Sequence, residues 1–313
     1  MGNSVRQDDT GGAAVVRGTV SPTPEAAETP PDAAWDPAQY GRFAEERSRP
    51  FHELVARIRT PSPRRVLDLG CGPGELTLQL AQRWPDAHVI GLDSSPEMLE
   101  RARALDVDAR VEWAQSRAED WVDAAGGEPF DVIVTNATLQ WVPTHLRLIP
   151  AWFGALRPGG TFAMQVPANF DAPSHRLMRE VAARHARAED LAPGLDRARS
   201  VALLETYAAL LLDLGAEVDA WETTYLQVLA TREDAAHPVL EWVRGTGLRP
   251  VLGVLTEAEE RAAFLTDYER ELDLAYPRRG FGVLFPFTRL FAVGRKPDSA
   301  AEKMTEEPAE IAS

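Results

Sequence analysis

The sequence predicts an α/β protein with a doubly wound, parallel sheet, helices on both faces and a helical cap. Short apolar strands alternate with amphipathic helices from residue 64 to residue 167, and a glycine-rich turn follows the first strand. After residue 168 the pattern becomes mostly helical, which predicts the cap. The chain has 313 residues, 44% of them hydrophobic, so it is long enough to bury one large core.

The strands and helices of the first part follow one another in order. Apolar, β-rich runs predict strands at 64–70, 87–93, 110–116, 130–136 and 161–167. Apolar residues at helical spacing predict helices at 75–84, 95–105 and 144–156. Ser94 or Ser95 is the expected N-cap of the second helix, and the breaker 158–160 is expected to precede the strand at 161–167.

The second part of the chain is expected to cover the carboxyl edge of the sheet. Helical patterns over 170–215 and 233–280 predict the cap, and strand patterns at 217–229 and 282–296 extend the sheet. Pro286 argues against a simple central position for the last strand, or marks a bulge. Residues 1–34 and the acidic residues 298–313 lack periodicity and are predicted to be disordered tails, which leaves 35–297 as the folded domain.

Charge and composition exclude several classes of partner. The formal net charge is −15, which disfavours nucleic acid and anionic membrane surfaces. A single cysteine, Cys71, excludes an internal disulfide, and the histidines show no metal-ligand spacing, so no metal site is predicted. Without a long apolar run or a signal peptide pattern, a cytoplasmic protein is expected. The oligomeric state stays open, a monomer included.

A glycine-rich segment, VLDLGCGPGE at 66–75, predicts a ligand-binding turn between a strand and a helix. Its glycines are Gly70, Gly72 and Gly74. Glycine suits a backbone that turns sharply and approaches a ligand, and the amides at the following helix N-terminus face that ligand. Asp93 ends the next strand, where an acid can bind the ribose hydroxyls of a nucleoside.

The acids of this segment favour a cationic nucleoside over a dinucleotide. A dinucleotide motif would have glycine at position 75, where this chain has Glu75, and Asp68 adds a carboxylate before the first glycine. The segment resembles motif I of class I S-adenosylmethionine (SAM) methyltransferases. That resemblance implies SAM as cofactor, with the glycine loop and Asp68 at its amino-acid end. The resemblance places Asp93 and the adjacent Ser94 at the ribose of SAM.

The rest of the implied SAM pocket departs in part from that family. Arg117 stands where an acid near the adenine is usual, so adenine contacts would fall to the Ala118 backbone and to Glu119 or Asp120. Asn136 ends the fourth strand, where the resemblance directs the sulfonium and the methyl group. A polar cap on the next turn is an equally good interpretation of Asn136.

Further segments resemble the trans-aconitate 2-methyltransferase family from about residue 35 to residue 296. They are WDPAQYGRFAEERSRPFHELVARI (35–58), NATLQWVP (136–143), EWVRGTGLRPVL (241–252), AYP (275–277) and LFPFTRLFAV (284–293). The resemblance implies transfer of a methyl group from SAM to one carboxylate of trans-aconitate or a similar small polycarboxylate. A carboxylate with a pKa near ~4 is already ionised at neutral pH, so no catalytic base is obligatory.

A polycarboxylate acceptor requires cationic groups in an otherwise acidic protein. Guanidinium groups bind carboxylates bidentately, and turn glycines surround the arginines of 241–252. The residues expected to position the acceptor are Tyr40, Gln140, Trp141, Arg244, Arg249 and Arg289. Trp141 could equally be a core residue, and each arginine could be a surface residue.

Other functions compete with this hypothesis. The same enzyme class could act on another small acid or natural-product intermediate, since cap residues diverge easily while the scaffold persists. A SAM-binding module without turnover is a hypothesis from a different class. A nicotinamide dehydrogenase is disfavoured by Glu75.

Overall fold

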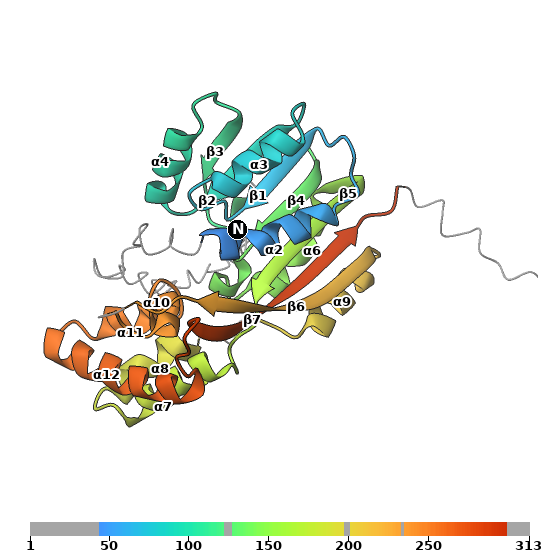
Figure 1. Cartoon of the computed structure of the whole chain (residues 1–313). Helices are drawn as coiled ribbons and strands as arrows, with labels where there is room; N and C mark the ends of the chain where they lie inside the picture. Colours follow the sequence, from blue (N-terminus) through green and yellow to red (C-terminus); the bar gives the residue numbers. More distant parts are fainter. Residues whose placement is uncertain (1–43, 122–126, 197–200, 233–234, 299–313) are drawn as a thin grey trace, which may run out of the picture.

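The computed structural model describes residues 44–121, 127–196, 201–232 and 235–298 (Figure 1). The predicted tail 1–34, all but Asp298 of the predicted tail 298–313, and Tyr40 lie outside these ranges. The described strands form one 7-stranded sheet in the order β3-β2-β1-β4-β5-β7-β6. Strand order reverses direction between β1 and β4, where ligands bind in open α/β sheets.

The strands confirm the predicted α/β fold but correct the expectation of a purely parallel sheet. They are β1 (Arg65–Leu69), β2 (His88–Asp93), β3 (Val111–Gln115), β4 (Phe130–Asn136), β5 (Leu156–Pro167), β6 (Glu217–Leu229) and β7 (Val283–Arg295). Strands β1 to β5 pair in parallel, whereas β7 is antiparallel to both β5 and β6. The predicted breaker 158–160 lies inside β5, where the register with β4 shifts between Phe130 and Val132.

Helices cover both faces of the sheet, as predicted. They are α2 (Ala44–Ala56), α3 (Glu75–Arg83), α4 (Pro96–Leu105), the 3-10 turn η2 (Leu139–Trp141), α6 (His145–Gly154), α7 (Pro173–Arg184), α8 (Ala188–Asp196), α9 (Leu204–Asp213), α10 (Pro238–Arg244), α11 (Arg249–Val254) and α12 (Ala258–Ala275). Apolar residues of α2 and α3, such as Leu54 and Leu80, pack on one face. Those of α6 and α9, such as Trp152 and Leu211, pack on the other.

The β6–β7 pair extends beyond the rest of the sheet and supports the cap. β7 pairs with β5 only over 289–295 but with β6 over 283–295, so Pro286 has a strand neighbour on one side only. Phe285 and Phe287 in this extension belong to a buried cluster with α7, α8, α10, α11 and α12, which surround it in Figure 1. Helix α9 lies within the range predicted for the cap, but it packs on β6 and β7.

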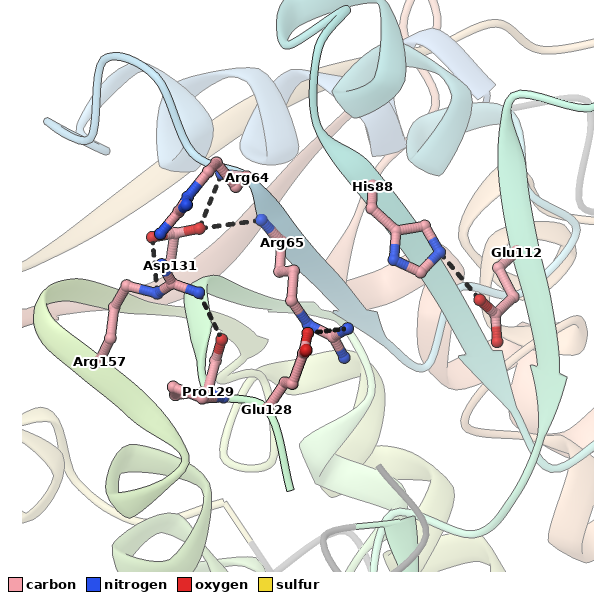
Figure 2. Close-up of polar contacts among 8 residues, drawn as sticks. All are labelled: Arg64, Arg65, His88, Glu112, Glu128, Pro129, Asp131 and Arg157. Carbon is pink, nitrogen blue, oxygen red and sulfur yellow. Dashed lines mark hydrogen bonds and ion pairs between the residues drawn. The ribbon is translucent and has the colours of Figure 1, made fainter. Parts of the chain in front are cut away.

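Charged side chains at the amino edge of the sheet connect neighbouring strands through hydrogen bonds and ion pairs. The Asp131 carboxylate accepts hydrogen bonds from the backbone N–H groups of Arg64 at 2.7 Å and Arg65 at 2.9 Å (Figure 2). It also pairs with Arg157, with 2.9 Å between Nε and Oδ1, so it joins the beginnings of β1, β4 and β5.

No helix among the described residues is long and apolar enough to cross a membrane.

Candidate functional site

The glycine turn after β1 is anchored to the end of β2. The backbone N–H groups of Gly70 and Cys71 both donate to the carbonyl of Leu92, at 2.8 and 3.0 Å. Gly70 has φ +84°, and a Cβ at this position would overlap the side chain of Thr138. Only glycine therefore allows β1 to turn this closely beneath the segment that follows β4.

The next glycine connects the turn to the predicted ribose acid. Asp93 Oδ2 accepts from the backbone N–H of Gly72 at 2.9 Å, and its Oδ1 accepts from that of Ser95 at 2.9 Å. A carboxylate has about four lone-pair positions, so both oxygens can still accept from a ligand. Gly72 has φ +54°, and no described atom lies within 4 Å of the place of a Cβ. The turn thus presents open backbone beside a fixed carboxylate.

Asp68 lies buried beneath this turn. It is 3% exposed and accepts a hydrogen bond from Thr77 Oγ1 at 2.6 Å. Burial raises the pKa of Asp68 to about 6; the Thr77 hydrogen bond opposes this shift and the Asp93 charge adds to it. A cation bound here would favour the ionised form. Burial also raises the pKa of the Cys71 thiol, which therefore remains protonated at neutral pH.

The residues expected around the adenine are present but partly engaged within the protein. The Ala118 carbonyl accepts from Trp152 Nε1 at 3.2 Å, and Glu119 pairs with Arg117 at 3.2 Å. Ser94 is exposed, and Ser95 rather than Ser94 is the N-cap of α4. The Ala118 N–H and the Glu119 carboxylate therefore stay predictions for this part of the pocket.

The turn after β4 adjoins the glycine turn, and Asn136 at the end of β4 carries a buried acceptor. Thr138 Oγ1 donates to the Gly70 carbonyl at 3.2 Å, which joins the two turns. Asn136 Oδ1 is buried and has no hydrogen-bond partner among the described residues. Ala137 has φ +52°, a strained conformation for a residue with a side chain, and its carbonyl accepts from Gln140 Nε2. Trp141 is 56% exposed, so it is not a core residue.

This set of groups suits a cationic, donor-rich ligand. Asp68 near the end of β1, Asp93 at the end of β2 and Asn136 at the end of β4 all carry acceptor oxygens at the carboxyl edge. SAM carries an ammonium group, ribose hydroxyls and a positive sulfur, which these acceptors complement. The residues present therefore fit SAM.

Farther along the same edge, a buried arginine lies next to an amide that the sequence analysis missed. Arg289 is 7% exposed; its Nη1 donates to Gln165 Oε1 at 3.5 Å, and its guanidinium stacks over the Phe287 ring at 4.8 Å. Gln165 pairs with Asn136 on β4, and Pro167 pairs with Arg289 on β7. The only sequence signal for Gln165 is its polarity inside the apolar run TFAMQVP.

The other predicted acceptor-binding arginines belong to the cap. Arg244 ends α10 and pairs with Glu241, with 3.5 Å between Nε and Oε1. Arg249 begins α11, and burial lowers the pKa of its guanidinium. The ring centroids of Trp242 in the cap and Phe287 lie 5.4 Å apart, and Phe287 is the ring over which Arg289 stacks, so the cap contacts Arg289 through Phe287. Whether Arg244 and Arg249 bind the acceptor stays a prediction.

The fold and the site together define a SAM-dependent class I methyltransferase, and a methyltransferase domain family matches residues 66–160. The trans-aconitate 2-methyltransferase of Streptomyces coelicolor is 50% identical over 273 residues, covering 85% of this chain and 88% of the relative. Its namesake in Rhodococcus jostii is 48% identical, covering 83% of this chain and 99% of the relative. That of Azoarcus is 47% identical, covering 83% and 98%. The chain belongs to the trans-aconitate 2-methyltransferase family.

Proposed function

We propose that the enzyme transfers a methyl group from SAM to one carboxylate of trans-aconitate or a similar small polycarboxylate. The proposal rests on Arg289, a residue 7% exposed, whose guanidinium comes from the same sheet edge as the acids that suit SAM. An arginine fork in a low-dielectric site binds carboxylates strongly and bidentately. The family resemblance to trans-aconitate 2-methyltransferases supports the same acceptor class.

The protein's part in the reaction is to bind SAM and the acceptor, to align them and to exclude water. SAM, when bound, supplies a methyl group on positive sulfur; a carboxylate oxygen accepts it, and the electrons of the broken bond return to sulfur. The acceptor is ionised at neutral pH, so no residue has to remove a proton. Asp93 and the glycine turn would hold the cofactor, while Arg289 would orient the acceptor toward Asn136. Desolvation of the attacking oxygen on binding would add to the rate.

We also propose a cytoplasmic location and a small-molecule acceptor, with no nucleic acid involved. The net charge of −15 repels polyphosphate chains, which supports the absence of a nucleic-acid partner. Trp141 and Gln140, next to the strained turn after β4, would form one wall of the acceptor pocket.

The test is the formation of S-adenosylhomocysteine from SAM with trans-aconitate, cis-aconitate, citrate or isocitrate supplied separately. We expect the highest kcat/KM with trans-aconitate. SAM affinity measured by calorimetry in the same preparation serves as the control for an intact cofactor site. Normal SAM binding without turnover of any of these acids would contradict the proposed acceptor and favour another acid.

A further inference from the structure

We propose that Gln165 determines acceptor specificity, binding, together with Arg289, a carboxylate of the acceptor other than the one that is methylated. The proposal rests on the methyl transfer to a polycarboxylate proposed above. Gln165 is 0% exposed, and its Nε2 has no hydrogen-bond partner among the described residues. Its Oε1 accepts from Arg289 Nη1 at 3.5 Å.

A buried, unpaired amide nitrogen needs a physical reason. Leaving such a donor unsatisfied costs about 1–3 kcal/mol, and the great majority of buried polar side-chain atoms have partners. The neighbours of Gln165 on β5, Met164 and Val166, are apolar and 0–1% exposed. Packing alone would be served by Met or Leu, so we infer that the Gln165 donor is kept for a ligand.

The position of β5 in the sheet shows where this donor lies. β5 stands between β4, which bears Asn136, and β7, which bears Arg289. The oxygen and nitrogen of a planar amide diverge, so Nε2 does not share the contact that Oε1 makes with Arg289. Asn136 Oδ1 and Gln165 Nε2, on adjacent strands, both lack a hydrogen-bond partner among the described residues. A ligand lying along this edge would meet the Gln165 donor between Asn136 and Arg289.

The chemistry of these donors selects the kind of ligand. A guanidinium and a neighbouring amide N–H together match the two oxygens of a carboxylate, and the neutral amide adds no second buried charge. Donors placed on the attacking carboxylate would withdraw electron density from its oxygen. Placed on a different carboxylate, they only orient the molecule. The pair accordingly favours acceptors with at least a second carboxylate.

The experiment combines variants of the enzyme with acceptors that lack one carboxylate. Gln165→Met removes the donor at nearly constant shape, and Gln165→Glu replaces it with an acceptor that repels carboxylates. Gln82→Met, on the exposed surface of α3, is the matched control. Each enzyme is assayed with trans-aconitate and with mesaconate, trans-glutaconate and itaconate, each of which lacks a different one of its three carboxylates. SAM affinity is measured by calorimetry for every variant.

We expect Gln165→Met to lower kcat/KM for trans-aconitate about 10- to 100-fold, mainly through KM, since a hydrogen bond to a charged group is lost. Gln165→Glu should lower it further, while SAM affinity stays within about twofold of wild type, because Asp93 and the glycine turn are untouched. On whichever dicarboxylate lacks the carboxylate bound by Gln165, wild type and Gln165→Met should have equal kcat/KM.

Other outcomes separate this inference from the proposed function. Equal losses on all acceptors, or a loss of SAM affinity in Gln165→Glu as well as in Gln165→Met, would show a structural role and overturn the specificity assignment alone. A wild-type enzyme that binds SAM but turns over none of these acids would overturn both the assignment and the proposed acceptor class.

Discussion

At the β1–β4 half of the carboxyl edge the main chain forms most of the site, whereas at the β5–β7 half side chains from distant segments form it. In the first, the cofactor half, Gly70 and Gly72 place backbone amides against Leu92 and Asp93. In the second, the proposed acceptor half, Gln165 and Arg289 are 124 positions apart in the chain and meet through β5–β7 pairing. A binding site for a common cofactor can thus stay constant while an acceptor site built from side chains diverges.

The strongest test of the cofactor half is Asp93→Ala. We expect SAM affinity to fall by at least about 100-fold, since ribose hydrogen bonds are lost and the Gly72 and Ser95 amides lose their acceptor. Calorimetry with SAM measures the effect, and circular dichroism checks that the fold is intact. Asp86→Ala, which removes an exposed acid with the same change in net charge, is the control. Unchanged SAM affinity in folded Asp93→Ala would refute the assignment.

A second test asks whether the backbone geometry itself matters, using neighbouring glycines. Gly70→Ala should destabilise the protein by about 3–5 kcal/mol, because φ is +84° and the new Cβ overlaps Thr138. Gly72→Ala has open space and should cost only about 1–2 kcal/mol for its left-handed conformation. Urea unfolding compares the two variants. Equal destabilisation would mean that the contact between the two turns does not constrain Gly70.

The acids of the cofactor half also predict opposite pH trends for binding and for stability. With a pKa of about 6, Asp68 ionises as pH rises, so SAM affinity should increase about tenfold per pH unit up to that value. The raised pKa stabilises the ligand-free fold below the ordinary value of 3.8, and this contribution is lost as pH rises through about 6. Calorimetry and thermal unfolding from about pH 5 to about pH 8 measure both trends. Asp68→Asn should flatten them; a slope that persists in this variant belongs to another group.

The smallest expected effect concerns the cap. Arg244→Ala and Arg249→Ala should each raise the acceptor KM about 3- to 10-fold, as expected for partly exposed cations, and leave SAM affinity unchanged. Steady-state kinetics with trans-aconitate measures KM, and Arg270→Ala, an exposed arginine of α12, is the control. Wild-type KM values in both variants would show that these two cap arginines do not bind the acceptor, which would leave only the residues of the sheet edge.

The contrast between the halves explains what could be predicted from the sequence. The strands, most helices, Asp93 and the glycine turn follow from local patterns, because each depends on residues close together in the chain. The antiparallel insertion of β7 between β5 and β6 depends on long-range pairing, which no local pattern encodes. Gln165 was missed for the same reason: its polarity becomes informative only when Arg289 lies beside it.

The extension of β7 beyond β5 has a consequence for how this enzyme can change. Phe287, in the cap core, and Arg289, at the proposed acceptor site, are separated by a single residue of one strand. Side chains alternate along a strand, so inserting one residue between them would turn Arg289 to the α9 face or Phe287 out of the cap. Residues of the cap and of the pocket can therefore be substituted in evolution. An insertion or deletion of one residue between Phe287 and Arg289 would instead remove one of these two side chains from its place.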